Sequence, residues 1–239
     1  ATALLARQLG VRHTLDLDVY RAVAHDQAER DFRRAAATDL GDWFGFEPGR
    51  SIPVADASTG IRLPVTAHIG TIEWVRFHVD ITAESVRMTA PADDVPPLIA
   101  VAIPGLNRPG YRAYPLVDHI ADKTCAILER HGPARRPSTR FKDLVDLVAL
   151  TGHAGVSAAA QRRALQSEAT RRRLDLPDRF SVPDHKLWES GYAAEAARAV
   201  AVPAPTLQQA LTLVCPFIDP LLANTADGNW DPKHGAWRP

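Results

Sequence analysis

The pattern of apolar residues differs between the two halves of this chain, with strand-like segments in the first half and helical segments in the second. Apolar and polar residues alternate over residues 15–20, and residues 61–69 and 74–82 are rich in Ile, Val, Thr and aromatic residues, so these segments predict strands. The short apolar run 98–103 predicts a buried strand. Helices are expected over 3–9 and 23–38, and a loop over the Gly-, Pro- and Asp-rich stretch 42–60.

The second half reads as helical. Helices are predicted over residues 117–131, 141–150, 157–174, 187–200 and 206–222, with prolines between several of them. The polar tail 224–239 is expected to form a surface strap or to be partly disordered. We therefore predict an α+β chain, with a mixed-sheet domain over 1–113 and an all-α helical domain over 114–239.

Composition excludes several classes of protein. The 239 residues contain 28 Lys and Arg and 28 Asp and Glu, so a uniformly basic nucleic-acid coat is excluded. Two cysteines are too few for a disulfide scaffold or a four-cysteine zinc site. No membrane helix and no secretory signal are evident, so we expect a soluble, cytoplasmic protein. Because the chain begins at Ala1 without Met, we expect native residues upstream.

Three carboxylates on predicted strands are the sharpest chemical signal. Alternation places Asp16 and Asp18 on the same face of one strand, and it places Asp80 on the polar face of another, with Arg76 and His78. Hard oxygen ligands of this kind suit Mg²⁺, and three carboxylates can hold cations that activate a hydroxyl and stabilise a leaving pyrophosphate. The alternative is a solvated strand face.

A lysine and two further acids lie on the predicted helices. Lys123 could meet a triphosphate as a point charge, or it could be a surface lysine whose stem packs on apolar neighbours. Asp143 and Asp146 are three residues apart on a helix that is apolar nearly all round, so they need partners, with Lys123 and Arg140 as candidates. An ion pair of this kind would clamp the two halves together.

These residues fall in blocks that resemble the AbiEii/AbiGii nucleotidyltransferase toxins, in particular the mycobacterial MenT toxins. The blocks are Leu15-Asp16-Leu17-Asp18, Phe77-His78-Val79-Asp80, Tyr114-Pro115-Leu116-Val117-Asp118-His119-Ile120-Ala121-Asp122-Lys123 and Arg140-Phe141-Lys142-Asp143-Leu144-Val145-Asp146-Leu147. They occur in matching order over roughly residues 1 to 200. The resemblance implies a polymerase-β-like nucleotidyltransferase domain followed by a helical domain.

The resemblance also implies roles for these residues. Asp16 and Asp18 match the family's Mg²⁺-binding pair, Asp80 a third carboxylate, and Lys123 the lysine that contacts the nucleotide. Either Asp143 or Asp146 matches its essential late aspartate. Thr14 lies where some relatives carry a residue that the antitoxin phosphorylates, which would add negative charge beside the metal site.

One feature of the family is not found. The Gly-Gly or Gly-Ser turn that cradles the triphosphate should fall at or just before Ala1, so a shortened or divergent chain is expected to bind nucleotide poorly.

The charge distribution fits an RNA partner. Residues 121–175 contain eleven Lys and Arg against six Asp and Glu, and phosphate contacts dominate nucleic-acid affinity. The candidates for RNA contacts are Arg162, Arg163, Arg171, Arg172 and Arg173. A solvated helix face is the alternative.

The predicted function is a Mg²⁺-dependent toxin that transfers a nucleotide from an NTP, CTP by resemblance, to the 3′ end of tRNA and so blocks translation. Its partners would be tRNA and a cognate antitoxin. Two alternatives remain open: a nucleotidyltransferase acting on a protein or small molecule, and an inactive module that sequesters antitoxin or RNA. The oligomeric state is not predicted.

Overall fold

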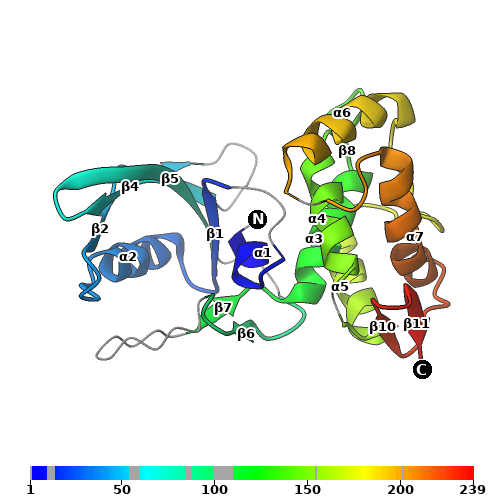
Figure 1. Ribbon diagram of the computed structural model, residues 1–239, viewed down its shortest axis with the longest axis horizontal. Coiled ribbons are helices and arrows are strands. Elements are labelled where there is room, and N and C mark those ends of the chain that lie inside the picture. Colours follow the sequence, from blue (N-terminus) through cyan, green and yellow to red (C-terminus); the bar gives the residue numbers. More distant parts are fainter. Residues whose placement is uncertain are drawn as a thin grey trace. The chain divides into compact units, whose positions relative to one another are not determined.

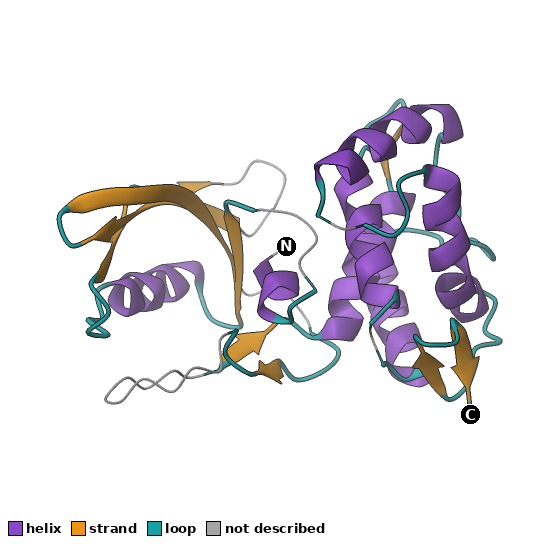
Figure 2. Ribbon diagram, viewed as in Figure 1, coloured by secondary structure: helices purple, strands orange, loops and turns teal. Residues whose placement is uncertain are grey.

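The computed structural model describes residues 2–9, 14–53, 60–83, 88–98, 110–153, 155–200 and 202–239. The chain forms two compact units, one containing a sheet and the other mainly helical (Figures 1 and 2). The predicted α+β class is confirmed. The predicted strand over 98–103 lies outside the described residues, apart from Leu98.

The sheet unit contains a five-stranded mixed sheet. Its strands are β1 (Asp16–Arg21), β2 (Phe44–Pro48), β3 (Ile52–Pro53), β4 (Gly60–Ile69) and β5 (Ile72–Ala83). The order is β1-β5-β4-β2, with β3 also paired to β4. β1 runs parallel to β5, whereas the other neighbours are antiparallel.

One face of this sheet carries the core of the unit. Helix α2 (His25–Ala36) lies against that face (Figure 1). Ala28 of α2 packs with Leu63 and Val65 of β4 and with Val79 and Ile81 of β5, all of which are buried. Because side chains alternate along a strand, the residues between these core positions point to the opposite face.

The prediction of a loop over 42–60 was wrong in part. β2 and β3 lie inside it and pair with β4 along its outer side. Gly45, Pro48 and Pro53 lowered their strand signal, but prolines are tolerated where a strand lies at the edge of a sheet.

Among its described residues, the second unit contains five long helices. They are α3 (Leu116–Leu128), α4 (Phe141–Thr151), α5 (Ala158–Arg172), α6 (His185–Arg198) and α7 (Leu207–Leu222). Side-chain caps fix the N-terminal ends of α5, α6 and α7. Their N-cap residues, Ser157, Asp184 and Thr206, each accept a hydrogen bond from a backbone N–H in the first turn. A shared apolar core runs through these helices, including Ile120, Leu147 and Trp188.

Short elements complete the helical unit. They are helix α1 (Thr2–Ala6) and the strand pairs β6 (Asp93–Val95) with β7 (Tyr111–Ala113), β8 (Arg130–His131) with β9 (Arg136–Pro137), and β10 (Asn229–Asp231) with β11 (Ala236–Arg238). The first predicted helix of the second half therefore ends at Leu128 rather than at 131.

The C-terminal tail is ordered, not a loose strap. It forms the β10–β11 hairpin, in which Trp230 is buried and its Nε1 donates to the carbonyl of Thr151 at 2.7 Å. The Trp230 and Trp237 rings pack on Phe217 of α7. Aromatic burial therefore fixes a segment whose polar composition indicated exposure.

The chain crosses between the two units more than once. Of the described residues, 3–9 and 88–98 belong to the helical unit, although they precede the predicted boundary. Leu4 is buried in the helical core, and Arg7 donates to the carbonyl of Tyr114 at 2.7 Å and to Asp93 at 2.5 Å. The side chain and backbone N–H of Thr89 donate to the buried Asp118 of α3.

Candidate active site

The open face of the sheet carries the predicted carboxylates. Asp16 and Asp18 are both exposed on β1, while Leu17 and Val19 between and after them pack toward the core. In the register of the sheet Asp18 lies beside Asp80 of β5, and Asp80 lies beside Arg62 of β4. A row of two acids and one arginine therefore runs across three neighbouring strands.

Asp80 is held by an arginine that the sequence analysis did not single out. The Nε–H group of Arg62 donates a hydrogen bond to Oδ1 of Asp80, and its Nη2 group donates one to Oδ2, both at 2.7 Å. This two-point pairing raises the pKa of Arg62 further above its usual value, with Asp16 and Asp18 adding smaller contributions. Outward positions on the predicted strand 61–69 were the available signal, but pairing Arg62 with Asp80 required the strand register.

The geometry of these carboxylates bears on the predicted metal site. Within the described part of the chain, no group of three or more His, Cys, Asp or Glu residues is placed to hold one metal ion. Asp16 and Asp18 supply two exposed carboxylates on one strand face, which fits Mg²⁺ bound through one or two carboxylates together with substrate phosphates. Asp80 is already bound to Arg62, so its metal role remains a prediction.

Thr14 lies directly before the carboxylate strand. Its Oγ1 accepts a hydrogen bond from the backbone N–H of Asp16 at 3.2 Å, and the hydroxyl of Thr2 donates to the carbonyl of Asp16 at 2.7 Å. Negative charge added to Thr14 would therefore lie two residues from Asp16.

The helical unit contains a buried charge cluster, here called the Lys123 cluster: Lys123, Arg140, Asp143 and Asp146. The Lys123 ammonium donates to Oδ1 of Asp143 at 2.9 Å and to Oδ2 of Asp146 at 2.7 Å. Arg140 Nε donates to the other oxygen of Asp143 at 2.7 Å. The expected partners of the two acids are therefore present.

Because the Lys123 cluster is buried, its charged groups shift one another's pKa values. Lys123 is 4% exposed and Asp146 0%. Burial alone would lower the pKa of Lys123, but the carboxylates of Asp143 and Asp146 outweigh it and raise that pKa. Burial likewise favours neutral Asp143, but Lys123 and Arg140 reverse this effect and lower its pKa.

The interpretation of this ion pair needs one correction. Both α3 and α4 belong to the helical unit, so the Lys123 cluster joins two packed helices and does not clamp the two halves of the chain. Its charges balance within the cluster. Two of the three N–H groups of Lys123 are taken by carboxylates.

The predicted RNA-contacting arginines fall into two groups. Arg172 is surrounded by acids, with donors 2.5 Å from Glu168 and 2.6 Å from both Asp122 and Glu129. Arg171 also pairs with Glu168, and Arg162 donates to the carbonyl of Ala226 at 2.9 Å.

The side chains of Arg163 and Arg173 are exposed and have no hydrogen-bond or ion-pair partner among the described residues. The predicted set therefore contains both arginines that stabilise the fold and arginines that are available to a ligand.

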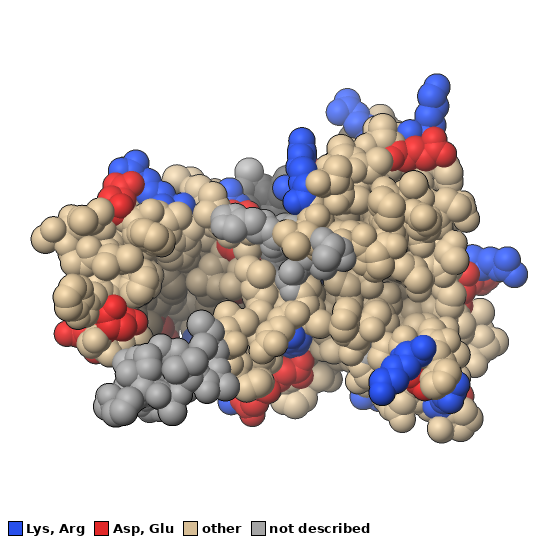
Figure 3. Space-filling model, viewed as in Figure 1, with Lys and Arg blue, Asp and Glu red and all other residues tan. Residues whose placement is uncertain are grey.

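No large field of one sign dominates the visible surface. On the face drawn in Figure 3, Lys and Arg side chains are scattered and mixed with Asp and Glu. Within the described residues, no helix is long and apolar enough to cross a membrane. Across the described residues on the face drawn in Figure 3, no broad basic surface for RNA phosphates is visible.

Comparison with known proteins agrees with this architecture. The family model described as nucleotidyl transferase AbiEii toxin, type IV TA system, matches residues 1–213. Among solved structures, JHP933 of Helicobacter pylori is similar at 16% identity with a TM-score of 0.50, over 94% of this chain and 82% of that chain. MenT4, a nucleotidyltransferase toxin of Mycobacterium tuberculosis, matches at 15% identity with a TM-score of 0.46, over 94% and 82%. No curated protein matches.

Proposed function

Because this chain belongs to the AbiEii family, the nucleotidyltransferase toxins of type IV toxin–antitoxin systems, we propose that it transfers a nucleoside monophosphate from an NTP to the 3′ end of tRNA. The modified tRNA can then no longer serve translation. The observation that carries the proposal is the pair of exposed carboxylates, Asp16 and Asp18, on the open face of β1. CTP is the proposed donor, from the family resemblance alone.

Each residue of the sheet face has a distinct part in this proposal. Asp16 and Asp18 would hold Mg²⁺, which when bound supplies charge neutralisation on the triphosphate and favours ionisation of the attacking hydroxyl. Arg62 fixes the carboxylate of Asp80 in one orientation through two hydrogen bonds. Asp80 is thereby held in one position beside Asp18 on the neighbouring strand.

The proposed reaction is an in-line displacement. The 3′ hydroxyl of the RNA forms a bond to the α-phosphorus of the NTP, and the bond from that phosphorus to the bridging oxygen of the β-phosphate breaks. Pyrophosphate leaves, and the hydroxyl proton passes to solvent. Positioning and charge stabilisation account for most catalysis in transfers of this kind.

Lys123 contributes through its remaining donor. Asp143 and Asp146 fix the ammonium group by taking two of its N–H groups, so the proposed contact with a nucleotide phosphate uses the third. Asp143 and Asp146 are positioning residues in this proposal, because their carboxylates act through Lys123. Family membership also indicates a cognate antitoxin, and phosphorylation of Thr14 is its proposed mode of action.

The test supplies total tRNA, Mg²⁺ and each α-³²P-labelled NTP in turn. We expect label on tRNA with one preferred nucleotide for the wild-type chain, and at least a 100-fold lower rate for Asp16→Asn and Asp18→Asn, since transition-state charge stabilisation is lost. Mn²⁺ binding followed by electron paramagnetic resonance gives a second readout that does not depend on turnover.

Glu73→Gln is the matched control, because Glu73 is an exposed acid of the same sheet whose carboxylate pairs with Arg76. It should retain wild-type transfer and Mn²⁺ binding. Label on protein or on a small molecule instead of tRNA would contradict the proposed acceptor. Full activity of Asp16→Asn would contradict the proposed site.

A further inference from the structure

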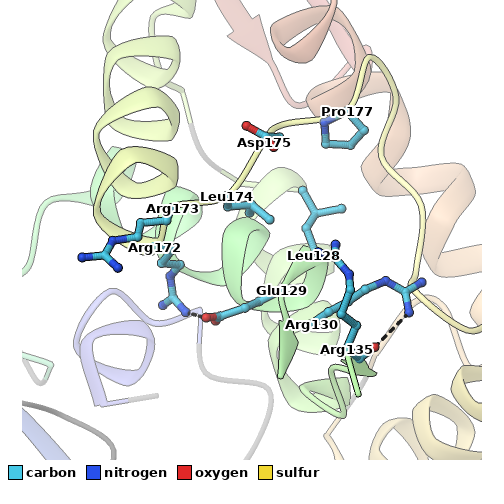
Figure 4. A pocket seen from close by; sticks show the side chains of 9 residues that line it. All are labelled: Leu128, Glu129, Arg130, Arg135, Arg172, Arg173, Leu174, Asp175 and Pro177. Carbon is cyan, nitrogen blue, oxygen red and sulfur yellow. Dashed lines mark hydrogen bonds and ion pairs between the residues drawn. The ribbon is translucent and has the colours of Figure 1, made fainter. Parts of the chain in front are cut away.

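A basic pocket lies in the helical unit, away from the Lys123 cluster along α3. It has a volume of about 290 Å³ and forms where the end of α3, the β8–β9 hairpin and the segment following α5 meet (Figure 4). Its charged lining residues, the pocket arginines and their acidic neighbours, are Arg130, Arg135, Arg172, Arg173, Glu129 and Asp175.

The charges in this pocket do not balance. Glu129 is matched by Arg172, whose Nη1 donates to it at 2.6 Å, as Figure 4 shows. Arg130 donates to the backbone carbonyls of Pro183 at 2.8 Å and Arg135 at 3.4 Å. Carbonyl groups hold its guanidinium in place but carry no net charge, so the positive charge of Arg130 is not cancelled.

Arg135 and Arg173 add to this excess. Neither side chain has a carboxylate partner within the described residues. Asp175 is the one acid of the lining that is not matched by Arg172. The lining holds four arginines and two acids. Arg172 also contacts Asp122 and Glu168 outside the lining, so Arg130, Arg135 and Arg173 carry the positive excess that favours an anion.

Backbone conformation singles out the same two arginines. Arg135 has φ 45° and Arg173 has φ 53°, in the left-handed region that disfavours side chains other than glycine. Arg173 ends α5 in this conformation, where glycine is the usual residue. The sequence thus places arginine at two positions of one pocket where glycine would be less strained, which points to a role for the side chains beyond folding.

We propose that this pocket binds one backbone phosphate of the RNA acceptor. A guanidinium presents a planar pair of N–H donors that matches two oxygens of a phosphate. Contacts to phosphate position an RNA without reading its sequence, so the pocket would hold the body of the acceptor while its 3′ end reacts elsewhere. This inference rests on the proposed RNA substrate.

The experiment measures equilibrium binding of labelled tRNA to the full chain, without NTP, over a range of salt concentrations. Arg130→Gln, Arg135→Gly and Arg173→Gly should each weaken binding about 5-fold. Each should reduce the slope of log K against log salt by up to about 0.7–0.9, the value for complete loss of the one phosphate contact. Arg198→Gln is the control, because it removes an exposed arginine of α6 outside the pocket.

A second measurement separates binding from stability. Removing left-handed strain should leave the Tm of Arg135→Gly and Arg173→Gly unchanged or raise it by about 2–4 °C. Weaker RNA binding together with a higher Tm is the expected signature, because a merely structural arginine would lower the Tm when removed. A variant that binds RNA more weakly and also has a lower Tm than wild type would overturn the proposal.

The remaining outcomes identify which part is wrong. If wild-type chain binds no RNA, the proposed acceptor fails. If wild type binds RNA and the pocket variants bind it equally well, or no worse than Arg198→Gln, only the pocket assignment fails. If the variants lose affinity for NTP or for an acidic antitoxin peptide instead of RNA, the pocket serves that ligand and the RNA assignment is overturned.

Discussion

At the scale of single residues, the Lys123 cluster shows why a charge can be stable inside this unit. Transferring an ammonium group from water into a protein interior costs several kcal/mol. Lys123 compensates this cost with two short contacts to Asp143 and Asp146, and Arg140 supplies the second cation. Each of these charged groups would be unfavourable in the interior by itself. Each is therefore stabilised by the opposite charges of its partners.

Replacing Lys123 by Met should destabilise the chain by about 3–5 kcal/mol, because two buried carboxylates lose their partner. Urea unfolding followed by circular dichroism measures this loss. Lys142→Met is the matched control, since Lys142 is exposed on the same helix as Asp143, and it should change stability by less than about 0.5 kcal/mol. If the two substitutions changed the free energy of unfolding equally, the Lys123 cluster would contribute nothing to stability.

The same cluster predicts two limits of stability with pH. The pKa of Asp143 is lowered from its usual 3.8, so its contribution is present above that pH and is lost as pH falls through the folded-state value. The pKa of Lys123 is raised from 10.5, so its contribution is present below that pH and is lost as pH rises further. The unfolding free energy should therefore fall below about pH 4 and above about pH 10.5.

Asp143→Asn should make the acid limb of this profile shallower, and Lys123→Met should do the same for the alkaline limb. Unfolding free energies measured from pH 2.5 to 11.5 provide the comparison. Parallel profiles for wild type and both variants would assign the pH dependence to other groups.

At the scale of elements, local pattern predicted most helices and the long strands. Alternation located β1, and the content of Ile, Val, Thr and aromatic residues located β4 and β5. Alternation also put Asp16, Asp18 and Asp80 on the outward face. It carried no information on register, so the pairing of Asp80 with Arg62 across β4 and β5 was not predictable. The arginine pocket was equally hidden, because segments distant in the chain form it.

Close packing of α4 against α6 makes a further prediction. A Cβ added to Gly191 of α6 would lie 2.4 Å from the ring of Phe141 on α4. Gly191→Ala should therefore destabilise the chain by about 1–3 kcal/mol through overpacking, although alanine is the better helix former by about 1 kcal/mol. Thermal unfolding measures the difference.

Gly155→Ala is the control for this substitution, since no described residue lies within 4 Å of its added Cβ. Combining Gly191→Ala with Phe141→Leu should cost less than the two single changes added together, because the smaller side chain relieves the overlap. Simple additivity would mean that the helices move apart freely.

At the scale of the whole molecule, a balanced total charge conceals an uneven distribution. Acids gather on the open face of β1 and β5, whereas uncompensated arginines line the pocket beside α3 and α5. One region suits a divalent cation and the other a phosphate. A protein that joins a nucleotide to RNA needs both kinds of contact, so the two regions support the same proposed reaction although different units carry them.

The cellular consequence follows from the proposed acceptor. Induced expression of this chain in a bacterial host without its antitoxin should stop incorporation of ³⁵S-methionine before RNA synthesis falls, because blocked tRNA 3′ ends cannot be aminoacylated. Asp16→Asn should abolish this effect at equal protein level, whereas Glu73→Gln should retain it. Growth arrest with continued protein synthesis would point to an acceptor other than tRNA. Arrest by Asp16→Asn would mean that binding alone is toxic, since that variant keeps the pocket arginines and loses only a carboxylate of the sheet face.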